Sequence, residues 1–141
     1  MQSTIFTIGH SNKDSQAIID LLQTYSIDTL IDARSIPYSK HNPQFNRQDF
    51  KNLCEANKIK YEWRGNNIGG LDRNVYFDET CKELVERASK DERIAVMCSE
   101  GSHTQCHRHF TIQPKLEEYG AIVAHIQQDG AIIPPQIGLG L

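Results

Sequence analysis

Short apolar runs alternate along the chain with segments whose apolar residues recur at helical spacing. Runs rich in β-branched and aromatic residues predict strands, at residues 4–8, 29–33, 60–63, 94–97 and 121–126. The helical spacing predicts helices between these runs, at residues 15–25, 47–57, 78–88 and 105–119. Asp14 or Ser15 is placed to cap the first helix, and Gly120 to end the last one.

The alternation of strands and helices indicates the fold class. A strand, one helix and a second apolar strand form a unit in which the two strands run parallel. We therefore predict an α/β fold, a three-layer sandwich with a mostly parallel central sheet. A chain of 141 residues suits one domain with one core, so we expect residues 1–141 to form a single α/β domain.

Polar side chains gather where three of the predicted strands end. Gly9–Asn12, Asp32–Ser35 and Cys98–Arg108 each follow a strand, and a long loop at 35–46 leaves the second one. In parallel sheets, ligands bind at the carboxyl ends of the strands. The three clusters therefore predict one site.

The segment from Cys98 to Arg108 carries most of the candidate chemistry. A thiol near a helix N-terminus and arginines has a lowered pKa and acts as a nucleophile, which is one interpretation of Cys98 and Cys106. The other is a buried structural cysteine. Cys54 and Cys81 fall on apolar helix faces, so we expect them in the core.

Charged and polar residues beside the thiols have two interpretations each. Arg34 and Arg108 suit the bidentate grip of a phosphate or carboxylate, or else form ion pairs with Asp32 or Glu100. His10, Glu100 and His107 are candidates for moving protons. The alternative for His10 is a half-buried histidine in a loop, and the alternative for Glu100 is a solvated carboxylate.

Further residues are candidates for the mouth of the site. Gly69 and Gly70 would let the backbone approach a ligand closely. The aromatic candidates for stacking on a ligand ring are Tyr38, Phe45 and Trp63. The residues that would add positive potential are Lys40, His41, Arg47 and Arg64. For each of these side chains, plain packing is the commoner role.

A metal site is the competing interpretation of the same loop. Cys98, His103, Cys106 and His107 have zinc-compatible side chains, but their spacing matches no known zinc pattern. We therefore predict no metal and no cofactor, with a zinc-stabilised fold as an alternative.

The composition and net charge of the chain bear on the classes of binding partner. The chain is 38% hydrophobic and 23% charged with a net charge of −3, which does not indicate a large nucleic-acid footprint. Neither a membrane span nor a signal peptide is visible, so we expect a cytoplasmic protein with reduced cysteines and no membrane partner. The oligomeric state is not predicted.

Several sequence blocks together resemble the domain of unknown function 488 family. They are Thr7–Asn12, Leu30–Ser35 with Pro37 and Ser39, Asn42–Asn46, Ile68–Gly70, Met97–Glu100 and Cys106–Arg108. The resemblance implies a small α/β fold and adds Ser11, Ser39 and Asn46 to the ligand-binding candidates. A weaker likeness, to rhodanese and cysteine-phosphatase domains, concerns the fold alone.

The sequence leaves two functions open besides the zinc-stabilised fold. The first is a thiol-dependent hydrolase or transferase acting on a phosphate-bearing or other anionic substrate, such as a nucleotide or a nucleic-acid end. The second is a module that binds the same nucleotide-like ligand without chemistry.

Overall fold

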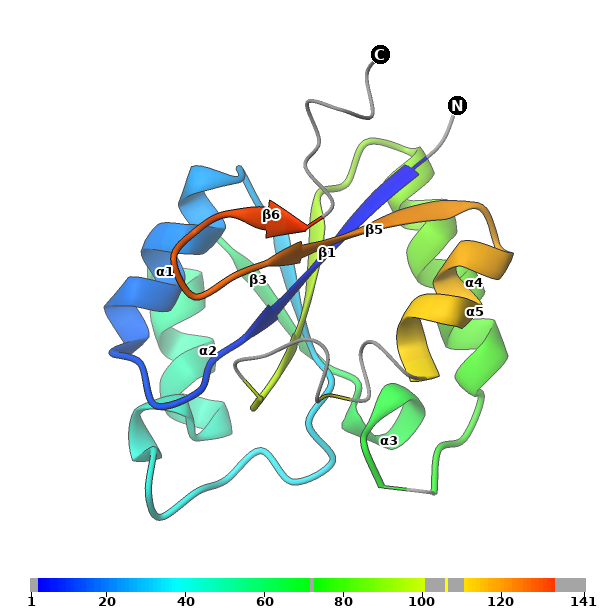
Figure 1. Cartoon of the computed structure of the whole chain (residues 1–141). Coiled ribbons are helices and arrows are strands. Elements are labelled where there is room, and N and C mark those ends of the chain that lie inside the picture. The colour runs from blue at the N-terminus through cyan, green and yellow to red at the C-terminus, as the bar shows by residue number, and fades with distance from the viewer. Residues whose placement is uncertain (1–2, 72, 101–105, 107–110, 134–141) are drawn as a thin grey trace.

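The structure is a computed structural model, and it describes residues 3–71, 73–100, 106 and 111–133 (Figure 1). One six-stranded sheet runs through the molecule in the order β3-β2-β4-β1-β5-β6. The strands are β1 (Ser3–Gly9), β2 (Thr29–Asp32), β3 (Lys60–Trp63), β4 (Ile94–Cys98), β5 (Ala121–Ile126) and β6 (Ile132–Ile133). All neighbours pair in parallel except β5 and β6, which are antiparallel. The predicted α/β sandwich is therefore confirmed.

Helices cover both faces of this sheet. They are α1 (Ser15–Thr24), the 3₁₀ helix η1 (Pro43–Phe45), α2 (Arg47–Ala56), α3 (Gly65–Ile68), α4 (Phe77–Ser89) and α5 (Gln113–Glu118). In Figure 1, α1 and α2 lie on one face, and α4 and α5 lie on the other. The Asp14 side chain caps α1 by accepting from the Gln16 amide, and Gly120 follows α5 with a φ of +99°. Both predicted caps are confirmed.

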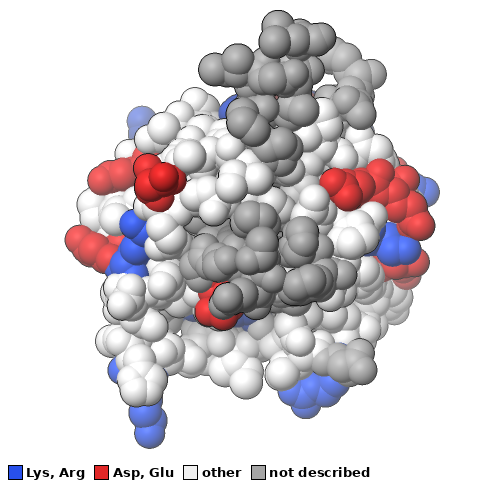
Figure 2. All heavy atoms as spheres, viewed as in Figure 1, with Lys and Arg blue, Asp and Glu red and all other residues white. Residues whose placement is uncertain are grey.

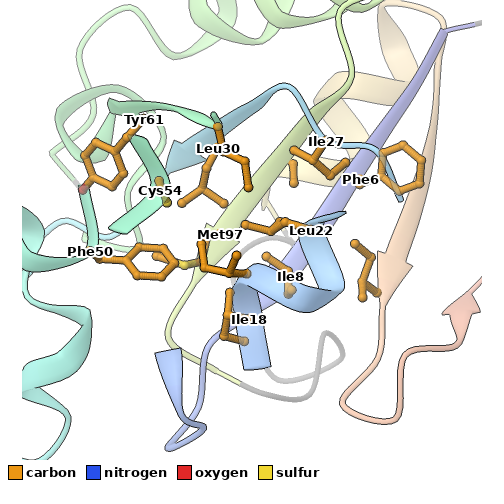
Figure 3. Close-up of a cluster of buried hydrophobic side chains, with 14 of the residues drawn as sticks. Phe6, Ile8, Ile18, Leu22, Ile27, Leu30, Phe50, Cys54, Tyr61 and Met97 are labelled. Atoms are coloured by element: carbon orange, nitrogen blue, oxygen red, sulfur yellow. The ribbon is translucent and has the colours of Figure 1, made fainter. Parts of the chain in front are cut away.

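The core follows from the alternation of side chains along the strands. Phe6 and Met97 point toward α1 and α2, where they meet Phe50 and Cys54 in the cluster shown in Figure 3. Their neighbours Ile5 and Val96 point to the other face, and they pack with the side chains of α4 and α5. Both faces of the central strands are buried, which explains why these strands are apolar throughout rather than alternating.

The connections place a switch point at the centre of the sheet. The chain leaves β1 through α1 on one face, whereas it leaves the adjacent β4 through α5 on the opposite face (Figure 1). Connections that diverge in this way open a crevice at the carboxyl ends of the two strands. The cluster after β1 and the cluster after β4 border that crevice.

Some local predictions are wrong in detail. The apolar spacing of the 47–57 helix predicts an inward-facing Ala56, but Ala56 is exposed on the last turn of α2. The polar and glycine-rich sequence of residues 66–71 predicts a turn or loop, but part of it belongs to the short helix α3. In the predicted 105–119 helix, Cys106 lies in a bend, residues 111–112 form a π-helical turn and α5 begins at Gln113, while residues 105 and 107–110 lie outside the described residues.

The described helices include none that is long and apolar enough to cross a membrane.

Candidate functional site

A pocket of about 480 Å³ opens where β1, β2 and β4 end. The carboxyl ends of these strands lie at the lower end of the sheet in Figure 1, near the loop that follows β2. The sequence candidates that line it are His10, Arg34, Ser39, Gly70, Cys98, Glu100 and Cys106. The sheet thus brings all three predicted polar clusters to one pocket.

Backbone hydrogen bonds beyond the strand ends hold His10 beside Cys98. The His10 amide donates to the Cys98 carbonyl at 3.0 Å, and the Ser11 amide donates to the Ser99 carbonyl at 2.8 Å. Likewise, the Ala33 amide donates to the Met97 carbonyl at 2.9 Å. The parallel pairing with the β4 segment therefore continues past the ends of β1 and β2 and fixes the walls of the pocket.

Asp32 and Arg34 form a buried ion pair at the base of the pocket. Arg34 Nε donates to Asp32 Oδ1 at 2.8 Å and Arg34 Nη2 donates to Oδ2 at 2.7 Å, a bidentate arrangement. The Arg34 amide and the Tyr61 hydroxyl also donate to this carboxylate. Asp32 is fully buried, so these donors replace the water that its charge has lost.

Burial and the opposite charges of Asp32 and Arg34 determine the protonation states of Arg34 and Tyr61. Burial opposes the charge of Arg34, but the hydrogen bonds and charge of Asp32 outweigh it and raise the Arg34 pKa. Burial and Asp32 together raise the pKa of the Tyr61 hydroxyl. Arg34 is therefore charged and Tyr61 protonated near neutral pH, as their donor roles require.

Arg34 retains hydrogen-bonding capacity that faces the pocket. Its Nη1 donates to His10 Nε2 at 3.4 Å, and its other side-chain hydrogen-bond partners are Asp32 and Tyr61. A guanidinium has five N–H groups, so these three side chains do not use all of its donor capacity. Since Arg34 lines the pocket, the remaining capacity is available to an anion there.

His10 is a neutral, fixed ring rather than a mobile proton carrier. Its Nδ1 donates to the Ser11 carbonyl at 2.6 Å, which leaves Nε2 to accept from Arg34. Burial lowers the His10 pKa from 6.5 to about 4; the Ser11 carbonyl opposes this shift and the charge of Arg34 adds to it. The ring stacks on Phe45 with 4.3 Å between centroids. This geometry favours a positioning role for His10 over the general-base role.

The thiols of Cys98 and Cys106 both belong to the pocket. Cys98 is 2% exposed and Cys106 is 4% exposed. Cys98 Sγ donates to the Glu100 carbonyl at 3.7 Å, and the Glu100 residue itself is exposed at the pocket wall. By contrast, Cys54 and Cys81 are confirmed in the core, where burial raises each thiol pKa to about 12.

Three polar candidates shape the scaffold around the pocket. The Asn46 side chain accepts from the Ser39 amide at 2.8 Å, which ties the loop after β2 to the start of α2. Ser39 Oγ in turn accepts from the amides of His41 and Asn42. Ser11 has a left-handed φ of 51° at the turn after β1. Of these three, only Ser39 lines the pocket.

The glycines act mainly through close packing. A Cβ on Gly69 would lie 2.1 Å from Ser35 Oγ, so no larger residue fits beside Ser35. The Leu71 amide donates to the same Ser35 hydroxyl, and Gly70 between them lines the pocket. The Gly69-Gly70 pair thus brings its loop against the segment after β2.

Several other candidates are engaged away from the pocket. The Trp63 ring lies under the Arg47 guanidinium, and its Nε1 donates to the Arg34 carbonyl at 2.8 Å. Arg64 pairs with Glu83 at 2.6 Å. Neither these two arginines nor Phe45 and Trp63 are pocket-lining residues, and Tyr38 is the ring candidate that lines it.

The sequence interpretation missed the roles of Tyr61, Ile36 and Leu71. Tyr61 completes the shell of Asp32 from β3, and a tyrosine in an edge strand gives no local signal of such a contact. Ile36 and Leu71 line the pocket although they are apolar and exposed. Their position in loops that flank the polar clusters was the available signal.

The zinc alternative involves residues that lie partly outside the described part of the chain. They contain no group of three or more His, Cys, Asp or Glu side chains that could hold a metal ion. Of the four proposed zinc ligands, Cys98 and Cys106 line the pocket, whereas His103 and His107 lie outside the described residues. Arg108 lies outside them as well.

The His10 pKa makes stability depend on pH. A histidine whose pKa is lowered on folding binds its proton more readily in the unfolded chain. His10 should therefore contribute full stability above pH 6.5 and lose it as the pH falls toward about 4, by about 3 kcal/mol in total. Urea unfolding at several pH values should show a smaller loss over this range in His10→Gln than in the wild type. Equal losses in both proteins would contradict the assignment.

The ion pair makes a second prediction about stability. Arg34→Ala should lower the free energy of unfolding by about 3–5 kcal/mol, because it leaves the buried Asp32 carboxylate without its counter-charge. The double variant Asp32→Asn/Arg34→Ala should be more stable than Arg34→Ala, since a neutral amide needs no counter-charge. Urea unfolding at neutral pH measures both. If the loss of stability in the double variant equals the sum of the losses in Asp32→Asn and Arg34→Ala, the two side chains are not coupled.

Comparison with known proteins bears on residues 14–75, which match the family model described as Domain of unknown function DUF488. This segment contains Asp32, Arg34, Ser39, Asn46 and the two glycines. It ends before Cys98, so the resemblance of the later blocks stays a prediction. Comparison with curated proteins gave no match. The similarity to the DUF488 family model therefore covers residues 14–75 of the 141-residue chain.

Proposed function

We propose that the protein is a thiol-dependent hydrolase or transferase that binds a small anionic substrate in the pocket at the ends of β1, β2 and β4. A phosphate ester is the substrate class that this arrangement suits best. Arg34 holds the anion and Cys98 is the nucleophile. The observation that carries the proposal is that the oriented guanidinium of Arg34 and Cys98 line one pocket.

The ion pair supports the anion-binding part of this proposal. Asp32 fixes the guanidinium plane through two parallel hydrogen bonds, so the remaining N–H groups of Arg34 are oriented before a ligand arrives. His10 limits the position of Nη1 from the other side. A pre-oriented donor loses little side-chain entropy when an anion binds.

The chemical step would begin at the Cys98 sulfur. A bond forms between Sγ and the phosphorus atom, while the bond from phosphorus to the leaving oxygen breaks and leaves its electron pair on that oxygen. The thiol proton passes to the leaving oxygen, and the Glu100 carboxylate at the pocket wall is the candidate carrier. Water or an alcohol then displaces the sulfur, which gives hydrolysis or transfer respectively.

One observation favours a second candidate, a binding module without chemistry. The Cys98 thiol donates to the Glu100 carbonyl, and such a bond stabilises the thiol rather than the thiolate. Burial also keeps His10 neutral, and both of its ring nitrogens are engaged, Nδ1 with the Ser11 carbonyl and Nε2 with Arg34. In this function Arg34 would bind the same anion, and Cys98 would only fill the pocket wall.

Thiol alkylation read cysteine by cysteine separates these functions. The enzyme predicts that iodoacetamide labels Cys98 well below the usual thiol pKa of about 8.5, and that inorganic phosphate slows this labelling. Cys54 and Cys81 are matched controls within the same molecule, because their pKa of about 12 and their core positions predict slow labelling that phosphate does not change.

The outcomes are distinct. Labelling of Cys98 that is slow and insensitive to phosphate would contradict the enzyme. Phosphate binding that persists in Cys98→Ser, together with slow labelling of the wild type, would establish the binding module. Stoichiometric zinc in the purified protein would identify the thiols as metal ligands instead.

A further inference from the structure

Three exposed apolar side chains surround the pocket that contains Arg34 and Cys98. Ile36 is 64% exposed, Tyr38 is 61% exposed and Leu71 is 41% exposed, and all three line the pocket. We refer to Ile36, Tyr38 and Leu71 as the apolar rim. Large apolar side chains that stay exposed around a polar cavity are typical of a binding site.

We propose that the substrate carries a flat aromatic ring beside its anionic group, and that this ring packs on the apolar rim. The inference rests on the proposed function, because it places the anion at Arg34. It adds the substrate class: an aryl phosphate or a mononucleotide rather than inorganic phosphate or a small aliphatic ester.

The apolar rim is held in place by its supporting contacts. Ile36 and Tyr38 flank Pro37, which is buried and whose carbonyl accepts from the Arg47 amide at 2.9 Å. The Leu71 amide donates to Ser35 Oγ at 3.1 Å. These bonds hold both sides of the rim in their exposed positions, so the exposure is built into the fold.

The shape and chemistry of the rim favour a ring. Tyr38 offers a flat face for stacking, which every aromatic ring can use. Ile36 and Leu71 add aliphatic surface that a planar group covers well. A volume of about 480 Å³ is in the range of sites for small molecules and leaves room for more than a phosphate group.

Charge favours a small molecule over a nucleic-acid strand. In Figure 2, the Lys and Arg atoms of the described residues on the face shown lie in separate groups. Glu100 at the pocket wall would also repel a second phosphate. The net charge of the whole chain is −3. A polymer with one charge per nucleotide is bound by a continuous basic surface, which neither the separate groups nor the net charge indicates.

Calorimetric titration with matched ligands tests the proposal. The probes are inorganic phosphate, 1-naphthol, phenyl phosphate, 1-naphthyl phosphate and adenosine monophosphate. In the wild type, 1-naphthyl phosphate should bind about tenfold more tightly than inorganic phosphate. Tyr38→Ala should remove most of this difference and leave the affinity for inorganic phosphate unchanged. Comparing the affinities of adenosine monophosphate and 1-naphthyl phosphate shows whether the site prefers a nucleobase to another aromatic ring.

The matched control is Tyr76→Ala, because Tyr76 is equally exposed, at 67%, and does not line the pocket. It should retain the full preference for the ring, and thermal unfolding of both variants checks that they fold. A preference that survives in Tyr38→Ala, or the absence of a preference in the wild type, would overturn the proposal.

The failure of the proposed function gives a different result. One result would support the ring site and contradict the anion site at Arg34. In that result, 1-naphthol binds to the wild type and binds more weakly to Tyr38→Ala, and no phosphate compound binds more tightly than 1-naphthol. If inorganic phosphate binds and the ring adds nothing, only the ring site fails. If no probe binds, both are overturned.

Discussion

A carboxylate and a guanidinium lie buried together where β2 ends, and the geometry of the pocket depends on this pair. Asp32 is removed from water by the sheet, and it is compensated by Arg34 and by the Tyr61 hydroxyl. The same bonds fix Arg34, whose remaining N–H groups and contact with His10 set one wall of the pocket. Because breaking a buried pair costs more stability than the pair contributes, its value lies in orientation as much as in stability.

The surrounding fold turns that pair into part of a site. β4 lies between β1 and β2, and α5, which follows β4, lies on the opposite face of the sheet from α1 and α2. Cys98 is the last residue of β4 and lines the same pocket as Arg34 and His10. Because Asp32 compensates the charge of Arg34, the proposed site would bind an anion through directed N–H groups rather than through excess positive charge.

Much of this arrangement could be predicted from the sequence. The features that could not be predicted depend on contacts between segments that are distant in the sequence. The strands, the main helices and the meeting of three polar clusters follow from apolar runs and from the rule that ligands bind at the ends of parallel strands. The Asp32 partnership with Arg34 was one of the open alternatives, since a buried carboxylate requires a nearby cation. The contributions of Tyr61 and Trp63 could not be predicted, because they depend on β3 pairing with β2 and on no local spacing. The neutral state of His10 depends on burial and on Ser11, Arg34 and Asp32, which only the assembled fold provides.

The central claim is that Arg34 binds the anionic group of the substrate while the Cys98 sulfur attacks it. A crystal structure of the protein with orthovanadate, which mimics a phosphoryl group under attack, tests this most directly. The account predicts vanadium bonded to Cys98 Sγ, with vanadate oxygens accepting from Arg34 Nη1 and Nη2 and with the Asp32–Arg34 pair intact. Vanadate bonded to Cys106, or bound elsewhere on the protein with Arg34 making no contact to it, would contradict the account.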